Sequence, residues 1–285
     1  MSDPVSSLAG TVFRMSDGVR IIADVGGDPA APTVVLMHGG GQTRHSWSGA
    51  MRALVEAGYH VINFDARGHG ESDWSPDGVY TLSIRARDLG EILRHNRGPV
   101  AFVGASMGGA TALYAVGEHV EPAPAALVMV DIVPRPNPVG TGKIKAFMGA
   151  NPEGFASLDE AADAVAAYNP HRPRPKDVSG LARNLRLRDG RYFWHWDPRM
   201  LDSGNQKVRE ERLLAFAGGL TMPTLLVRGL ASDVVSEEGV AEFRSILPAL
   251  EVVDVVGAGH MVAGDRNDAF NSGVIGFLER HMPPR

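Results

Sequence analysis

Residues 100–119 place the strongest constraint on how this chain folds. An apolar run at 100–103 is typical of a buried strand, the sequence Gly-Ala-Ser-Met-Gly follows at 104–108, and the pattern is then helical to about residue 119. A chain that passes from strand to helix through G-x-S-x-G makes a turn so sharp that the residues two before and two after the serine must lack bulk. The sequence therefore predicts that Ser106 lies in a strained turn at the C-terminal edge of a sheet, with its hydroxyl exposed.

The G-x-S-x-G match is informative because of what surrounds it. The chain has 34 glycines in 285 residues, and such a composition alone produces roughly a quarter of one match. A phosphate-binding loop would need a Lys-Ser or Lys-Thr pair or a further glycine at the right spacing, and this segment has neither. We therefore interpret Ser106 as a nucleophile, with the N–H of Met107 at the helix start as a binding site for negative charge.

Composition narrows the class of protein. A hydrophobic content of 44% and a charged content of 21% suit one large α/β domain, or a core with a smaller insertion. The net charge of −5 argues against a nucleic-acid or anionic-membrane partner. The absence of cysteine excludes a disulfide scaffold, a cysteine nucleophile and cysteine metal ligation. No signal peptide or membrane-spanning run is visible, so we expect a soluble, cytoplasmic protein.

Apolar runs and helical patterns alternate along the chain. An opening antiparallel hairpin is expected around Asp17-Gly18. Buried strands are expected at 33–37, 60–65, 100–103, 125–131, 223–229 and 251–256, and helices at about 46–58, 82–95, 109–119, 236–247 and from 267. Continuous apolar strands separated by helices predict an α/β fold, with a mostly parallel central sheet and helices on both faces.

The strand at 33–37 ends in a glycine-rich loop, His38-Gly-Gly-Gly-Gln42. Three glycines after a buried strand allow backbone N–H groups to approach a ligand closely. We expect Gly40 to supply the second N–H of an oxyanion hole beside Met107, with Gly41 as the next candidate. His38 is expected to hold this loop by hydrogen bonding.

Three motifs follow one another along the chain: L-x-H-G-G-G at 36–41, D-A-R-G-H-G-E-S at 65–72 and V-G-A-S-M-G-G at 103–109. With them the chain resembles the α/β-hydrolase superfamily, over residues 33–131 and again from Pro223. Within it, the chain is most similar to capped bacterial hydrolases grouped with epoxide hydrolases, non-haem haloperoxidases and carbon–carbon bond hydrolases. In the second motif, Asp65 and Arg67 are expected to order a tight loop.

The resemblance implies a core domain at 1–133 and 220–285, interrupted by a mainly helical cap at 134–219. The composition changes there, with clustered prolines, helical patterns at about 143–148, 158–168, 178–185 and 208–216, and a hairpin signal at Asp189-Gly190. A cap in this position would cover an apolar substrate pocket. The candidate substrate-binding residues are Trp194, Phe147, Tyr168 and Met261.

The chemistry of this fold needs an acid and a histidine after the serine, in that order. His260 follows the last strand in a Gly-Ala-Gly-His loop and is the predicted base. Asp233, just past the strand at 223–229, is the favoured acid, and Asp131, at the end of the preceding strand, is the alternative. The carboxylate would orient the imidazole and stabilise its cationic form.

We therefore expect a serine hydrolase that cleaves a carboxylic ester of a small, largely apolar molecule through an acyl-enzyme, without a metal or cofactor. A serine in this turn counts against epoxide hydrolase and dehalogenase chemistry, which needs a carboxylate nucleophile. Carbon–carbon bond hydrolysis of a diketone, perhydrolysis and a triad-bearing ligand sensor stay open as alternatives. The sequence indicates no oligomeric state.

Overall fold

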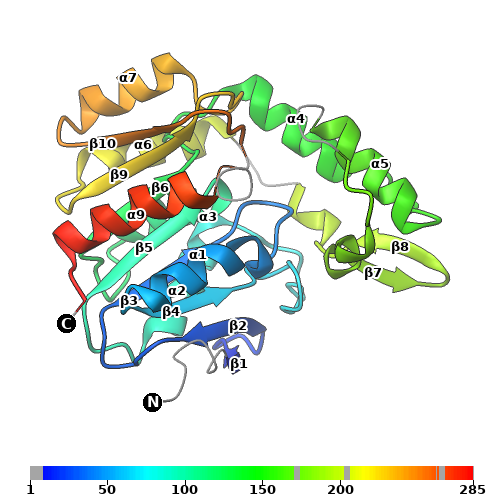
Figure 1. The fold of residues 1–285 in the computed structure, drawn as a ribbon, viewed down its shortest axis with the longest axis horizontal. Helices are drawn as coiled ribbons and strands as arrows, with labels where there is room; N and C mark the ends of the chain where they lie inside the picture. The colour runs from blue at the N-terminus through cyan, green and yellow to red at the C-terminus, as the bar shows by residue number, and fades with distance from the viewer. Residues whose placement is uncertain (1–8, 170–173, 202–205, 261, 263–266, 285) are drawn as a thin grey trace.

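The computed structural model describes residues 9–169, 174–201, 206–260, 262 and 267–284, and an eight-stranded sheet forms its centre (Figure 1). The strands are β1 (Ala9–Arg14), β2 (Arg20–Gly26), β3 (Thr33–Met37), β4 (His60–Phe64), β5 (Val100–Ala105), β6 (Ala126–Val130), β9 (Thr224–Gly229) and β10 (Glu251–Val255). Their order is β1-β2-β4-β3-β5-β6-β9-β10. The first two strands pair antiparallel, β2 is antiparallel to β4, and the remaining pairs are parallel.

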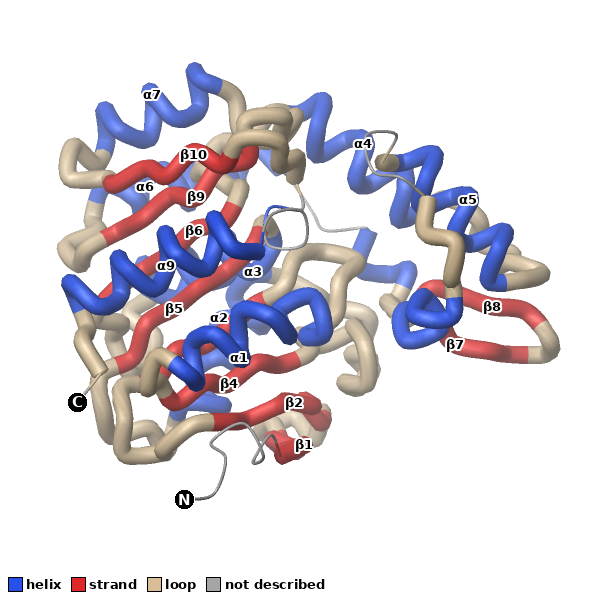
Figure 2. The backbone as a smooth tube through the Cα atoms, in the orientation of Figure 1, coloured by secondary structure: helices blue, strands red, loops and turns tan. Residues whose placement is uncertain are grey.

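Helices cover both faces of the sheet (Figure 2). They are α1 (Ser48–Glu56), α2 (Leu82–Leu93), α3 (Met107–Gly117), α6 (Gln206–Gly218), α7 (Glu237–Ile246) and α9 (Asn267–His281). Apolar residues of α1 and α9 pack on one face, and those of α2, α3, α6 and α7 pack on the other. Since both faces are covered, every residue of β3 and β6 is buried, which explains their continuous apolar sequence. The predicted fold class is confirmed.

A group of smaller elements projects beyond the C-terminal ends of the parallel strands (Figure 1). It contains α4 (Pro138–Gly149), α5 (Leu158–Tyr168), the hairpin β7 (Leu185–Arg188) and β8 (Arg191–Trp194), and short 3₁₀ helices at Ser179–Asn184 and Pro198–Leu201. Its buried apolar residues form a separate cluster that includes Phe155, Trp194 and Trp196. We call these elements the cap. The helical pattern at 178–185 corresponds to a short 3₁₀ helix, Ser179–Asn184, that leads into β7.

Helix α6, which lies within the expected cap range of residues 134–219, contacts the core. It packs against α3 of the core, where the rings of Phe216 and Tyr114 meet edge to face with centroids 5.4 Å apart. Leu213 and Ala217 on its apolar face are buried in the core cluster. These residues complete the cover of the sheet face beside α3.

Candidate active site

Ser106 occupies the turn between β5 and α3 with φ 47° and ψ −110°, a strained backbone for a residue with a side chain. The neighbouring glycines make this turn possible. A Cβ on Gly104 would lie 2.4 Å from the carbonyl carbon of Gly108, and one on Gly108 would lie 2.3 Å from the carbonyl oxygen of Met37. The steric argument from the sequence is therefore confirmed, and the turn presents Ser106 to a cavity.

The loop after β3 passes directly beside the serine, because a Cβ on Gly39 would lie 3.5 Å from Ser106 Cβ. Within the described residues the N–H groups of Gly40 and Met107 have no hydrogen-bond acceptor. The N–H of Gly41, by contrast, donates to His69 Nε2 at 3.2 Å. Gly40 and Met107 are thus the two candidates whose N–H groups are available to a ligand, and the second candidate, Gly41, is already engaged.

His260 and Asp131 form a hydrogen-bonded pair. His260 Nδ1 donates to Asp131 Oδ2 at 2.7 Å, because an ionised carboxylate only accepts. Asp131 is fully buried and also accepts from the N–H of Gly229, at 3.0 Å, and from the Ser232 hydroxyl. Because Nδ1 of His260 contacts Asp131, Nε2 is the ring nitrogen that does not face the carboxylate. Three donors hold the carboxylate, and the carboxylate in turn orients the imidazole.

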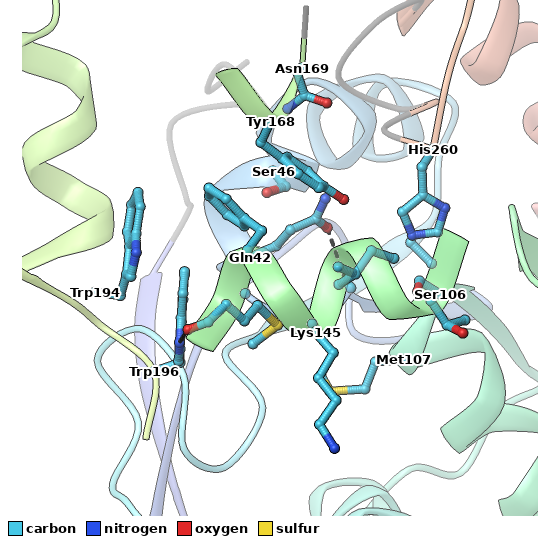
Figure 3. Close-up of a pocket in the computed structure, with 18 of the residues that line it drawn as sticks. Gln42, Ser46, Ser106, Met107, Lys145, Tyr168, Asn169, Trp194, Trp196 and His260 are labelled. Atoms are coloured by element: carbon cyan, nitrogen blue, oxygen red, sulfur yellow. Dashed lines mark hydrogen bonds between the residues drawn. The ribbon is translucent and has the colours of Figure 1, made fainter. Parts of the chain in front are cut away.

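Ser106 and His260 line one cavity of about 700 Å³ between the core and the cap. Figure 3 shows both on the same side of this cavity, with Trp194 and Trp196 on the opposite side. The two indoles are stacked with centroids 4.8 Å apart, and Phe147 stacks on Tyr168 at 4.3 Å. Phe147, Tyr168 and Trp194 line the cavity as expected, whereas Met261 lies outside the described residues.

Residues 32–266 match the family described as the alpha/beta hydrolase fold.

The chain belongs to the α/β hydrolase family.

A relative in this family is the esterase Rv0045c of Mycobacterium tuberculosis, which is 30% identical over 88% of this chain and 84% of its own length. Another is the mouse sn-1-specific diacylglycerol lipase ABHD11, which is 28% identical over 88% of this chain and 82% of its own length. Among solved structures, E-2-(acetamidomethylene)succinate hydrolase superposes with a TM-score of 0.83 at 22% identity, covering 95% of this chain and 99% of that one. This α/β hydrolase is therefore an enzyme with hydrolase activity.

The carboxylate beside His260 corrects the sequence expectation. We expected Asp233, but its side chain is 45% exposed and forms an ion pair with Lys143 at 2.8 Å. The flanking Val234 and Val235 are buried, whereas Asp233 faces outward. The alternative, Asp131, occupies the place next to the imidazole.

Three buried histidines, His38, His69 and His195, surround the loop that carries Gly40. His38 Nδ1 donates to the Gly39 carbonyl at 2.7 Å, which agrees with its expected role in holding the loop. His195 comes from the cap, and its Nε2 faces the Gly41 carbonyl at 3.3 Å. Burial lowers the pKa of all three, to about 3 for His195, so they are neutral at pH 7. Nothing in the sequence indicated His195, because its partners are far away in the chain.

The loop after β4 confirms the structural roles expected for Asp65 and Arg67. Buried Asp65 accepts from the N–H groups of Arg44 and Glu71 at 2.7 and 2.9 Å. Arg67 forms a buried bidentate pair with Asp88 at 2.7 and 2.8 Å. These contacts support the loop beneath the histidines.

Two further properties concern the described ranges only. No group of three or more His, Cys, Asp or Glu in them is arranged to hold a metal ion. None of their helices combines the length and apolarity needed to cross a membrane.

Proposed function

We propose that this α/β hydrolase is a serine esterase for a small-molecule substrate. The single observation that carries the proposal is the Asp131–His260 hydrogen bond of 2.7 Å, next to a serine held in a strained turn on the same cavity. A nucleophile, a base and a group that orients the base are the three parts that acyl transfer requires. The names of the esterase and lipase relatives support an ester as the bond that is cleaved.

The reaction begins when Ser106 Oγ attacks the carbonyl carbon of the ester and its proton moves to His260 Nε2. The N–H groups of Gly40 and Met107 stabilise the negative charge that develops on the carbonyl oxygen. The ester C–O bond then breaks, and the alcohol leaves with the proton from His260. Water next attacks the acyl-enzyme and gives a proton to the same imidazole, which returns it to Ser106 as the carboxylic acid departs. Asp131 stays ionised throughout and stabilises the imidazolium.

The test is a panel of 4-nitrophenyl esters of increasing acyl length, measured with the wild type and with Ser106→Ala. We expect the wild type to turn over one or more members and Ser106→Ala to lose at least about a thousandfold in kcat, with an unchanged melting temperature. Equal rates for the two proteins would remove Ser106 from the mechanism.

The time course of the same assay separates an enzyme from a sensor. Release of nitrophenol beyond one equivalent per protein, at a steady rate, supports the esterase. A burst of one equivalent followed by arrest would favour a ligand sensor that keeps the acyl group.

A further inference from the structure

Arg85 on α2 is a half-buried cation whose place is not explained by the packing of the core. Its side chain lines the cavity that contains Ser106. Its Nε is buried without a hydrogen-bond partner. A buried N–H of a charged group without an acceptor is costly, so its position on the cavity suggests that a ligand supplies the acceptor.

Two arginines that are buried in this protein, by contrast, have carboxylate partners. Arg44 pairs with Asp65, and Arg67 pairs with Asp88 through two hydrogen bonds. Asp88 is the carboxylate one turn along α2 from Arg85, but both of its oxygens are engaged by Arg67. No carboxylate in the described residues forms an ion pair with Arg85.

A second arginine reinforces this arrangement. Arg209 on α6 also lines the cavity, also has no ion pair within the described ranges, and its charge acts on Arg85. Burial, with a contribution from the charge of Arg209, lowers the pKa of Arg85 to about 10, so Arg85 stays charged at pH 7. Two cations that face one cavity repel each other unless an anion lies between them.

The remaining charged groups on the cavity do not neutralise the positive charge of Arg85 and Arg209. Arg174 is paired with Asp159 and Asp163, and Glu210 accepts from Gln206. The other charged side chains in the lining are Lys145 and Asp177. Between these groups the wall is apolar, with residues such as Leu82, Ala110, Ile132 and Leu213.

We propose that Arg85 and Arg209 form a carboxylate-binding subsite, so that the physiological substrate is an ester carrying a carboxylate on an apolar chain. The inference rests on the proposed esterase function and narrows its substrate class. A planar guanidinium matches the two oxygens of a carboxylate, and the charge-assisted bonds strengthen in a cavity that excludes water. The apolar wall suits the hydrocarbon that joins the carboxylate to the ester.

Two matched pairs of esters test the subsite. Mono-4-nitrophenyl adipate and 4-nitrophenyl hexanoate differ only by a carboxylate in place of the terminal methyl group of the acyl chain. The 3-carboxyphenyl and 3-methylphenyl butyrates place the same difference on the alcohol side. Both pairs are assayed with the wild type, Arg85→Met, Arg209→Met and the control Arg87→Met, an exposed arginine of the same helix that pairs with Asp17.

We expect Arg85→Met to lower kcat/KM by roughly 10- to 100-fold for the charged member of at least one pair, and by less than about threefold for its neutral partner. Arg209→Met should reduce the same charged ester by a smaller factor, and Arg87→Met should change neither. Because Arg209 lies on a different helix, α6, its variant keeps the test valid if Arg85→Met does not fold. Equal changes on charged and neutral esters, or no change on any, would overturn the subsite.

A binding experiment separates failure of the subsite from failure of the esterase function. Adipate is titrated by calorimetry into Ser106→Ala, with and without Arg85→Met. Binding that is lost, or weakened at least tenfold, with Arg85→Met supports the subsite even if no ester is hydrolysed. Adipate binding that is absent, or that is unaffected by Arg85→Met, counts against the subsite, even where neutral esters are turned over in a Ser106-dependent way.

Discussion

His195 Nδ1 accepts a hydrogen bond of 2.7 Å from the backbone N–H of Gly70, which joins the cap hairpin to the loop after β4. The opposite nitrogen of the same ring faces the carbonyl of Gly41, beside the proposed oxyanion donor Gly40. One neutral imidazole therefore bridges the cap and the loops at the site. It can do so only with a proton on Nε2 and a lone pair on Nδ1.

Replacement of His195 tests this bridge. We expect His195→Ala to lower kcat by about 10- to 100-fold, because a looser Gly40 loop binds the oxyanion less well while ground-state binding is less affected. KM and kcat for a 4-nitrophenyl ester are the measurements. His281→Ala, on α9 and away from the cavity, is the matched control and should keep wild-type values. A change in KM alone would contradict the role given to His195.

The three buried histidines predict a loss of stability in mild acid. Their folded-state pKa values lie below the ordinary value, so the unfolded chain takes up protons near pH 6.5 that the folded chain does not. Stability should therefore be complete above about pH 7 and fall as the pH drops, by up to about 1.4 kcal/mol per pH unit for each histidine. For His195 the loss continues towards about pH 3.

Urea denaturation between pH 7 and pH 5 measures this slope. His195→Gln keeps a donor and an acceptor in the side chain but cannot titrate, so its slope should be smaller by about one proton. Wild-type stability that does not change over this range would show that the histidines are not held neutral.

The kcat values of two variants distinguish the candidate acids, Asp131 and Asp233. Asp131→Asn should lower kcat by about a thousandfold or more, because the amide no longer stabilises the imidazolium or holds the Nδ1 proton of His260. Asp233→Asn should change kcat by less than about threefold and stability by less than about 1 kcal/mol, since it removes only an exposed ion pair with Lys143. The reverse order of kcat values would reassign the acid to Asp233.

The Arg67–Asp88 pair predicts a large effect on stability. Arg67→Met leaves Asp88 buried and without its bidentate partner, and we expect a loss of about 3–5 kcal/mol in the free energy of unfolding. The double variant Arg67→Met/Asp88→Leu should recover part of that loss, because no charge is then left buried. Chemical denaturation of both variants checks this, and a double variant less stable than Arg67→Met would contradict the explanation.

The sequence by itself determined the order of strands and helices, the strained turn at Ser106 and the glycine-rich loop at Gly40. These features depend on local causes, namely apolar runs, missing side chains and turn geometry, which a short stretch of chain displays. His260 could also be predicted, because its Gly-Ala-Gly-His loop directly follows the last strand.

Only the tertiary structure decided which carboxylate contacts His260, that His195 reaches the site, and that Arg85 Nε has no hydrogen-bond partner among the described residues. Asp131 and Asp233 both follow neighbouring parallel strands, β6 and β9, so their spacing in the chain cannot separate them. The choice depends on how the loop after β9 turns, with Val234 and Val235 packed inward and Asp233 outward. Contacts between residues about a hundred or more positions apart, such as Asp131–His260 and Gly70–His195, arise only when the whole core and cap have packed.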